Sequence, residues 1–168
     1  MIFKIKKTVS HRYWLEKTIE HAEQIPSQGG SPHPSVKVGA MIVSKKNRIL
    51  ATDVNRFAFG LNAGRSERYE DGARSLWINC AEQMTLMQAL KHHRDLSGAR
   101  MYITLEPCTV CAGLIVESGI KEIIVPESSH QFYDKLKKKW RDSIDVGRSK
   151  LKEAGVKVTY VDLSDSDK

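Results

Sequence analysis

Short apolar runs alternate with amphipathic stretches in the first part of the chain. Apolar residues three and four positions apart predict a helix over residues 13–23. Two apolar runs at 38–43 and 49–53 are typical of buried strands, and the polar residues 45–48 between them are typical of a turn. This region is therefore predicted to form one helix followed by a β-hairpin.

The second half repeats the order helix, then strand. We expect Asn79 to cap a helix that runs to about residue 91, with Met84, Met87 and Leu90 facing the core. The later elements are predicted as a strand at 101–105, a helix from Pro107 to Gly119, a strand at 122–125, a helix at 142–153 and a strand at 156–161. Residues 131–140 fit neither pattern. Helical crossovers join parallel strands, so we expect an α/β fold, a three-layer α/β/α sandwich on a five-stranded mixed sheet.

Two long polar segments interrupt these elements. Residues 24–34 contain glycine and proline and predict a loop, and residues 55–77 are polar with no clear period. Long loops in compact domains are commonly functional. The length of 168 residues suits a single domain over residues 1–168, with a core of about 10–161 and a frayed tail at 162–168.

The formal charge of +7 and the pI near 9.3 favour an anionic partner, such as a nucleotide or a nucleic acid. Much of the excess charge lies at 135–141, which fits a solvated face equally well, so nucleic acid is not the favoured partner. No apolar run reaches the roughly 18 residues that span a membrane. Residues 1–7 do not resemble a secretory signal, and we expect a cytoplasmic protein.

The three cysteines suggest a metal site. Cys108 and Cys111 form a Cys-x-x-Cys pair at the start of a predicted helix, and Cys80 lies at the start of another. Three thiolates bind Zn²⁺ and leave its fourth position open for water, as in a catalytic site. The alternative is a structural site with four ligands, which would add His33, His92, His93 or His130.

Glu82 follows the first expected ligand by two residues and points to the same place. It could take a proton from the zinc-bound water and return protons to a ring nitrogen and a departing amine. Backbone N–H groups near Ala81 and Cys108 could hold the base and the developing oxyanion. Cys80-Ala81-Glu82 and Pro107-Cys108-Thr109-Val110-Cys111 match the signature of zinc nucleobase deaminases, with cysteine as the first ligand. A structural zinc site would leave Glu82 without a role.

With these residues in view, the chain resembles the cytidine/deoxycytidylate deaminase superfamily, and deoxycytidylate (dCMP) deaminases most closely. Residues 34–40 are similar to the family's opening strand motif, and Asn55 to the asparagine that contacts the sugar. Residues 64–77 resemble an insertion of dCMP deaminases, and Trp140 with 153–156 resembles the end of bacterial and phage members. The resemblance implies a cytidine-deaminase-like fold and a zinc cofactor.

Other features of the chain differ from that pattern. Residues 105–113 are also very similar to tRNA adenosine deaminases, which have a much shorter loop before the first ligand. The first ligand is usually histidine in dCMP deaminases, where this chain has Cys80. Small cytidine deaminases share that cysteine, but an arginine follows their glutamate, where this chain has Gln83. Ala58 and Arg56 replace a proline and a glycine of the asparagine loop.

The resemblance implies a small-molecule nucleotide substrate. The guanidinium group of arginine suits phosphate, and lysine is also a cation. The candidates to hold the phosphate are therefore Lys37, Arg56, Arg65 and Arg68. Trp77 could stack on the base or fill the core. Asn55, Ala81, Pro107 and Cys108 complete the expected substrate-binding residues.

We expect hydrolytic deamination of dCMP to dUMP, by a homo-oligomer that is a dimer or a hexamer. One alternative is a deaminase whose substrate is another aminated ring (cytidine, a modified cytosine nucleotide, a free base such as guanine, or a tRNA adenosine). The other is a protein without enzymatic activity, a structural zinc module that binds nucleic acid.

Overall fold

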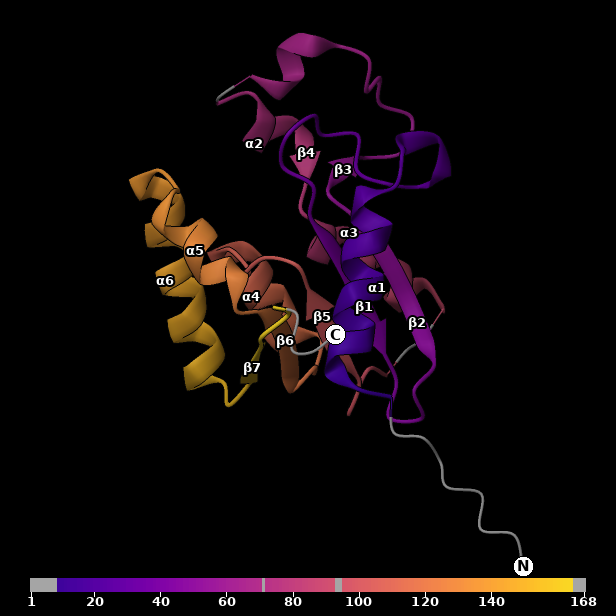
Figure 1. The fold of residues 1–168 in the computed structure, drawn as a ribbon, viewed down its shortest axis with the longest axis vertical. Coiled ribbons are helices and arrows are strands. Elements are labelled where there is room, and N and C mark those ends of the chain that lie inside the picture. Colours follow the sequence, from indigo (N-terminus) through magenta and orange to yellow (C-terminus); the bar gives the residue numbers. More distant parts are fainter. Residues whose placement is uncertain (1–8, 71, 93–94, 165–168) are drawn as a thin grey trace, which may run out of the picture.

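The fold is built on a five-stranded sheet with helices on both faces (Figure 1). The structure is a computed structural model, which describes residues 9–70, 72–92 and 95–164. The elements of the main sheet and its helices are α1 (His11–Glu23), β1 (Gly39–Val43), β2 (Ile49–Val54), α3 (Ala81–His92), β5 (Arg100–Ile103), α4 (Thr109–Glu117), β6 (Glu122–Pro126), α5 (Ser128–Asp134), α6 (Lys138–Glu153) and β7 (Lys157–Val161). The predicted order of helix, hairpin and helix–strand units is confirmed, and residues 131–140 form the end of α5 and the start of α6.

The strands lie in the order β2-β1-β5-β6-β7. β1 pairs antiparallel with β2 and with β5, whereas β5, β6 and β7 run parallel. The parallel part follows from the helical crossovers, because a chain that returns to the same edge of a sheet through a helix starts its next strand in the same direction. The predicted five-stranded mixed sheet is therefore confirmed.

Alternate residues of the strands enter two separate cores. On one face the strands contribute Ala40, Ile42, Met101, Ile103, Ile123 and Val125, which pack with buried residues of α3, α4 and α6. On the other face Met41, Val43, Tyr102 and Ile124 pack with Trp14 and Leu15 of α1. This period of two arises because successive side chains of a strand point to opposite faces, and it produces the predicted three layers.

The predicted inner face of α3 is wrong. Met87 and Leu90 are 57% and 49% exposed, while Ala81, Glu82, Thr85, Leu86 and Ala89 are buried. Ala81, Thr85 and Ala89 are small and spaced four apart, and this row lets the helix lie close to the hairpin of β1 and β2. The prediction places the larger apolar residues toward the core, but Met87 and Leu90 face away from the sheet.

The segment between β2 and α3 contains short elements that lie beyond one end of the main sheet (Figure 1). These elements are β3 (Arg56–Phe57), the 3₁₀ helix η2 (Ser66–Tyr69), α2 (Arg74–Trp77) and β4 (Ile78–Asn79), after an earlier 3₁₀ helix η1 (Pro26–Gln28). β3 pairs antiparallel with β4 and so brings both ends of the segment together. The predicted long loop is thus an irregular but folded insertion.

The end of the described chain lies against α1. Leu163 packs on the core beside α1, and the backbone oxygen of Ser164 accepts a hydrogen bond of 2.6 Å from Arg12. The predicted fraying is therefore wrong for residues 162–164, and residues 165–168 lie outside the described part. None of the helices in the described ranges is long and apolar enough to cross a membrane.

Candidate metal centre and substrate pocket

The three cysteines converge where α3 and α4 begin. Cys80 directly precedes α3, Cys108 is the N-cap of α4 and Cys111 lies in the first turn of α4. Their sulfur atoms all lie within 4.8 Å of one another. Thiolates bound to one tetrahedral zinc ion lie roughly 3.8 Å apart, so the three side chains fit the ion with little movement.

The charge of the cluster also favours a cation. Hydrogen bonds from the thiols of Cys111 and Cys80, with backbone N–H groups of Cys111 and Val110, hold the pKa of Cys108 well below its usual range. The pKa values of Cys80 and Cys111 are raised, chiefly because both hydrogen-bond to Cys108. The three sulfurs thus share protons around one thiolate. A zinc ion bound by three thiolates would take the place of those protons.

The alternative of a fourth, histidine ligand gains no support. Among the described residues, the three cysteines are the only cluster of histidine, cysteine and acidic side chains close enough to share an ion. His33, His92 and His130 lie outside it, and His93 is not among the described residues.

Gln83 supports the first cysteine. Its side-chain oxygen accepts a 2.9 Å hydrogen bond from the backbone N–H of Cys80, as the third residue of a helix does in a capping box. Asn79, the predicted cap, instead lies in β4 opposite Arg56. The first turn of α3 is therefore capped from within the helix, by the side chain of Gln83.

Glu82 lies in the first turn of α3 and is 4% exposed. Burial raises its pKa to about 8, and the nearby Cys108 sulfur acts in the same direction. A bound cation would counteract that rise. A buried carboxyl whose pKa lies near neutrality can both accept and return a proton, as the predicted acid–base role requires.

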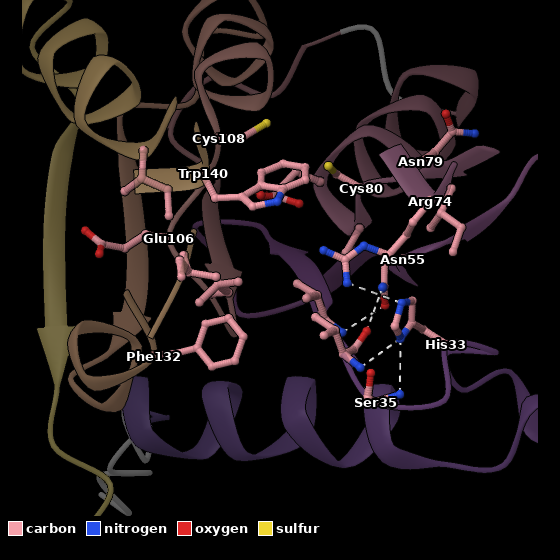
Figure 2. Close-up of a pocket in the computed structure, with 18 of the residues that line it drawn as sticks. His33, Ser35, Asn55, Arg74, Asn79, Cys80, Glu106, Cys108, Phe132 and Trp140 are labelled. Carbon is pink, nitrogen blue, oxygen red and sulfur yellow. Dashed lines mark hydrogen bonds between the residues drawn. The ribbon is translucent and has the colours of Figure 1, made fainter. Parts of the chain in front are cut away.

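Cys80, Glu82 and Cys108 line a cavity of about 430 Å³. Its other walls come from the loop before β1, from the end of the insertion and from the α5–α6 junction (Figure 2). The volume is in the range of roughly 300–1,000 Å³ that is typical of small-molecule sites. Segments that are distant in the sequence therefore form, around Cys80 and Cys108, a pocket large enough for a nucleotide.

Three of the predicted substrate-binding residues line this pocket, namely Asn55, Ala81 and Cys108. The Asn55 amide is largely committed to the backbone: its oxygen accepts from Val38 N–H and its nitrogen donates to the Val36 carbonyl, both at 2.8 Å. Asn55 thus holds the loop that forms one wall. Pro107 is buried directly before Cys108 but does not line the cavity.

The other predicted binders, which are Lys37, Arg56, Arg65, Arg68 and Trp77, do not line the cavity. Arg56 makes a two-pronged ion pair with buried Asp53, at 2.7 and 2.8 Å. The Arg68 guanidinium lies 3.9 Å from the centre of the Trp77 ring, on the insertion. Arg56 and Arg68 thus already have partners within the fold, and neither lines the cavity. Their expected contacts with phosphate are therefore not supported.

Sequence reasoning misses the cations that do line the pocket, Arg74, Lys135 and Lys137. It treats His33 only as a spare metal ligand, and that side chain also lines the pocket. Trp140 also forms part of the wall (Figure 2). In the sequence, only its resemblance to family members indicates a role for this residue. Proximity to the opening strand motif could have indicated His33. No local pattern distinguishes Arg74 from the other arginines of the insertion.

Helix α6 braces the loop that carries Cys108. Gly147 lies so close that a Cβ atom there would be 2.8 Å from the carbonyl oxygen of Pro107. The Ser143 hydroxyl accepts a 3.1 Å hydrogen bond from the backbone N–H of Thr109. Arg148 holds the buried carboxylate of Glu106 with bonds of 2.9 and 2.6 Å. The position of the second cysteine ligand thus depends on a helix more than thirty residues away.

The sequence profile described as "Cytidine and deoxycytidylate deaminase zinc-binding region" matches residues 12–127, which include both cysteine fragments. The chain belongs to this family. It is accordingly a hydrolytic deaminase with a zinc site, and Cys80, Cys108 and Cys111 form the cluster suited to that ion.

Curated relatives agree with this family. This deaminase is 31% identical over 152 residues to an uncharacterized deaminase of Aliivibrio fischeri encoded in the luxG 3′ region, an alignment that covers 89% of this chain and 95% of the relative. It is 32% identical to the deoxycytidylate deaminase of Homo sapiens over 99 residues. That alignment covers 56% of this chain and 54% of the human protein, so the chain spans about half of that relative.

Solved structures share the fold of this deaminase. The dCMP deaminase of cyanophage S-TIM5, in complex with dCMP and dUMP, superposes with a TM-score of 0.63 at 20% identity and covers 88% of this chain and 93% of its own. A Thermotoga maritima diaminohydroxyphosphoribosylaminopyrimidine deaminase/reductase superposes with a TM-score of 0.55 at 26% identity, over 90% of this chain and 37% of that protein. The predicted cytidine-deaminase-like sandwich is confirmed.

Proposed function

We propose that this deaminase converts dCMP and water to dUMP and ammonia. One observation carries the proposal: a buried carboxyl, Glu82, lies beside three converging cysteines in a pocket of nucleotide size that basic side chains border. The names of the human and cyanophage relatives support the same substrate.

Cys80, Cys108 and Cys111 would hold the zinc ion. When bound, zinc supplies Lewis acidity, which makes water a nucleophile near neutral pH. Glu82 accepts a proton from the attacking water and delivers it to the ring nitrogen beside the reacting carbon, as the new C–O bond forms. It then takes the proton of the added hydroxyl and delivers it to the departing amine. The C–N bond breaks as the C=O bond of the product forms, so one water is consumed and one ammonia is released.

The walls of the pocket position the base and exclude bulk water. Asn55 fixes the loop on one side, and Trp140 with Phe132 forms the apolar side opposite (Figure 2). A pyrimidine ring fits such a slot because aromatic side chains cover its faces at little conformational cost. Ala81, which directly follows the first ligand, leaves room beside the cysteines.

The proposal is tested by an ammonia assay on a substrate panel that contains dCMP, CMP, deoxycytidine, guanine and a tRNA. We expect the highest kcat/KM for dCMP. Glu82→Gln keeps the shape and removes the proton transfer, so it should retain one zinc per chain while kcat falls about 10²–10⁴-fold. Faster turnover of a tRNA or of guanine would replace dCMP as the substrate. Full activity of Glu82→Gln would contradict the role of the carboxyl.

The expected homo-oligomer also stays a proposal. Met87 and Leu90 of α3, and Val110 and Leu114 of the neighbouring α4, are each 43–57% exposed. Apolar rows on neighbouring helices are typical of contact surfaces. Light scattering should give a mass above that of one 19.0 kDa chain, and Leu90→Lys should lower it.

A further inference from the structure

The ring of His33 has a defined proton arrangement. Its Nδ1 atom accepts two backbone N–H groups, from Ser35 at 3.1 Å and from Val36 at 2.8 Å. The neutral ring therefore carries its proton on Nε2. Burial lowers the pKa of His33, and the positive charge of Arg74 lowers it further, so the neutral form prevails near pH 7. The Nε2–H group is consequently a donor.

A second donor faces it. Nη1 of Arg74 lies 3.5 Å from Nε2 of His33, and Arg74 has donors only (Figure 2). Two donors cannot satisfy each other. His33 is 3% exposed, so solvent has little access to the group. Within the described residues, no acceptor for His33 Nε2–H and no carboxylate partner for Arg74 is recorded.

The two donors belong to the wall of the pocket that holds the cysteines. The Arg74 guanidinium also lies 5.8 Å from the centre of the Trp140 ring, so it is directed across the cavity. Lys135 adds positive charge on the same lining. An oxygen atom with negative charge, placed between Nε2–H and the guanidinium, would accept from both.

We propose that His33 and Arg74 form a two-donor site for the phosphate of the substrate. The inference rests on the proposed function, and it names the residues that make this deaminase prefer a nucleotide over a nucleoside. Phosphate suits the site because its oxygens accept several hydrogen bonds and its charge complements an arginine. A ribose hydroxyl could accept the same bonds but would leave the guanidinium charge unpaired.

The test compares kcat/KM for dCMP and for deoxycytidine. Arg74→Ala should lower the ratio of the two values at least about tenfold, through the KM for dCMP, because a charge-assisted hydrogen bond is lost. His33→Asn places its side-chain oxygen where Nδ1 accepts and removes the Nε2 donor, so it should lower the same ratio with the loop intact. Arg65→Ala is the matched control, since Arg65 is an insertion arginine in an exposed ion pair with Glu67 outside the pocket.

A binding measurement separates this inference from the proposed reaction. Inorganic phosphate should raise the melting temperature of the zinc-loaded wild type and of Arg65→Ala, and should raise it less for Arg74→Ala and Arg74→Lys. If dCMP is not turned over but this pattern holds, the proposed function fails and the anion site stands. An unchanged substrate ratio in both the Arg74 and His33 variants, or equal phosphate responses in all proteins, would overturn the site.

Discussion

Arg148 donates hydrogen bonds to both carboxylate oxygens of Glu106, from Nε at 2.9 Å and from Nη2 at 2.6 Å. The Glu106 side chain is 2% exposed, and the Tyr160 hydroxyl donates a third hydrogen bond of 2.5 Å to it. Burial alone would raise the pKa of Glu106, but these hydrogen bonds outweigh it and hold the pKa below its usual value. The ion pair therefore connects α6, and the Tyr160 hydrogen bond connects β7, to the residue that precedes Pro107 and Cys108.

Removing the arginine should be costly. Arg148→Ala leaves a buried carboxylate without its counter-charge, and we expect the free energy of unfolding to fall by about 3 kcal/mol. Chemical denaturation of the zinc-loaded protein measures the loss. Lys138→Ala is the control on the same helix, because its ion pair with Asp142 is largely exposed and should contribute less than about 1 kcal/mol. Equal losses of unfolding free energy in Arg148→Ala and Lys138→Ala would show that the buried ion pair contributes no more to stability than the exposed one.

A second prediction concerns Gly147, where α6 approaches the Pro107 carbonyl. Alanine favours a helix over glycine by about 1 kcal/mol, yet a Cβ atom here would lie 2.8 Å from that backbone oxygen. We expect the clash to outweigh the propensity, since overpacking costs about 1–3 kcal/mol, and Gly147→Ala should lower both stability and zinc affinity. A more stable variant with unchanged zinc affinity would disprove the close approach.

Gly113 provides the comparison, because it also lies within a helix. A Cβ atom there would meet only the Lys150 Nζ atom at 3.8 Å, which is an ordinary contact. Gly113→Ala should therefore leave zinc affinity unchanged and raise the free energy of unfolding by up to about 1 kcal/mol. Thermal melts of the two glycine variants in the same buffer should show these opposite signs.

The metal centre could be predicted from sequence because its signal is local. Cys80 and Glu82 lie at the start of one helix, and Cys108 and Cys111 at the start of another, so spacing alone determines how each pair is presented. The strands could be predicted equally well, because their short apolar runs are bounded by polar residues. The buried face of α3 could not be predicted in this way, because most of it consists of small or polar residues, which carry little hydrophobic signal: Thr85 and Ala89 are buried while Met87 is exposed.

The phosphate contacts could not be predicted in the same way. Arg56, Arg68 and Arg74 belong to one irregular segment and have the same chemistry. Their difference lies in tertiary partners: Arg56 meets Asp53, Arg68 meets Trp77, and Arg74 alone of the three lines the pocket. Nothing in the spacing of an aperiodic segment specifies such partners.

A third prediction concerns the zinc ligands. Cys108→Ser should lose the ion, since an alcohol at this position is a far weaker ligand than a thiolate, and the melting temperature should fall because binding energy is folding energy here. A chelator should produce the same fall in the wild type and little further change in the variant. Metal analysis and thermal melts measure both effects. One zinc per chain in Cys108→Ser would remove that residue from the ligand set.

The last prediction follows from the lowered pKa of His33, whose ordinary value is 6.5. A histidine that resists protonation in the fold binds protons more readily in the unfolded chain. Its contribution to stability is therefore full above pH 6.5 and is lost as the pH falls below that value. His33→Asn keeps an acceptor for the Ser35 and Val36 N–H groups but does not titrate. The difference in unfolding free energy between wild type and His33→Asn should thus shift against the wild type between about pH 7.5 and about pH 5.5, while acid effects on the thiolates cancel because both proteins share them. A difference that stays constant over this range would show that His33 titrates normally, and would remove the reason to regard its ring as neutral beside Arg74.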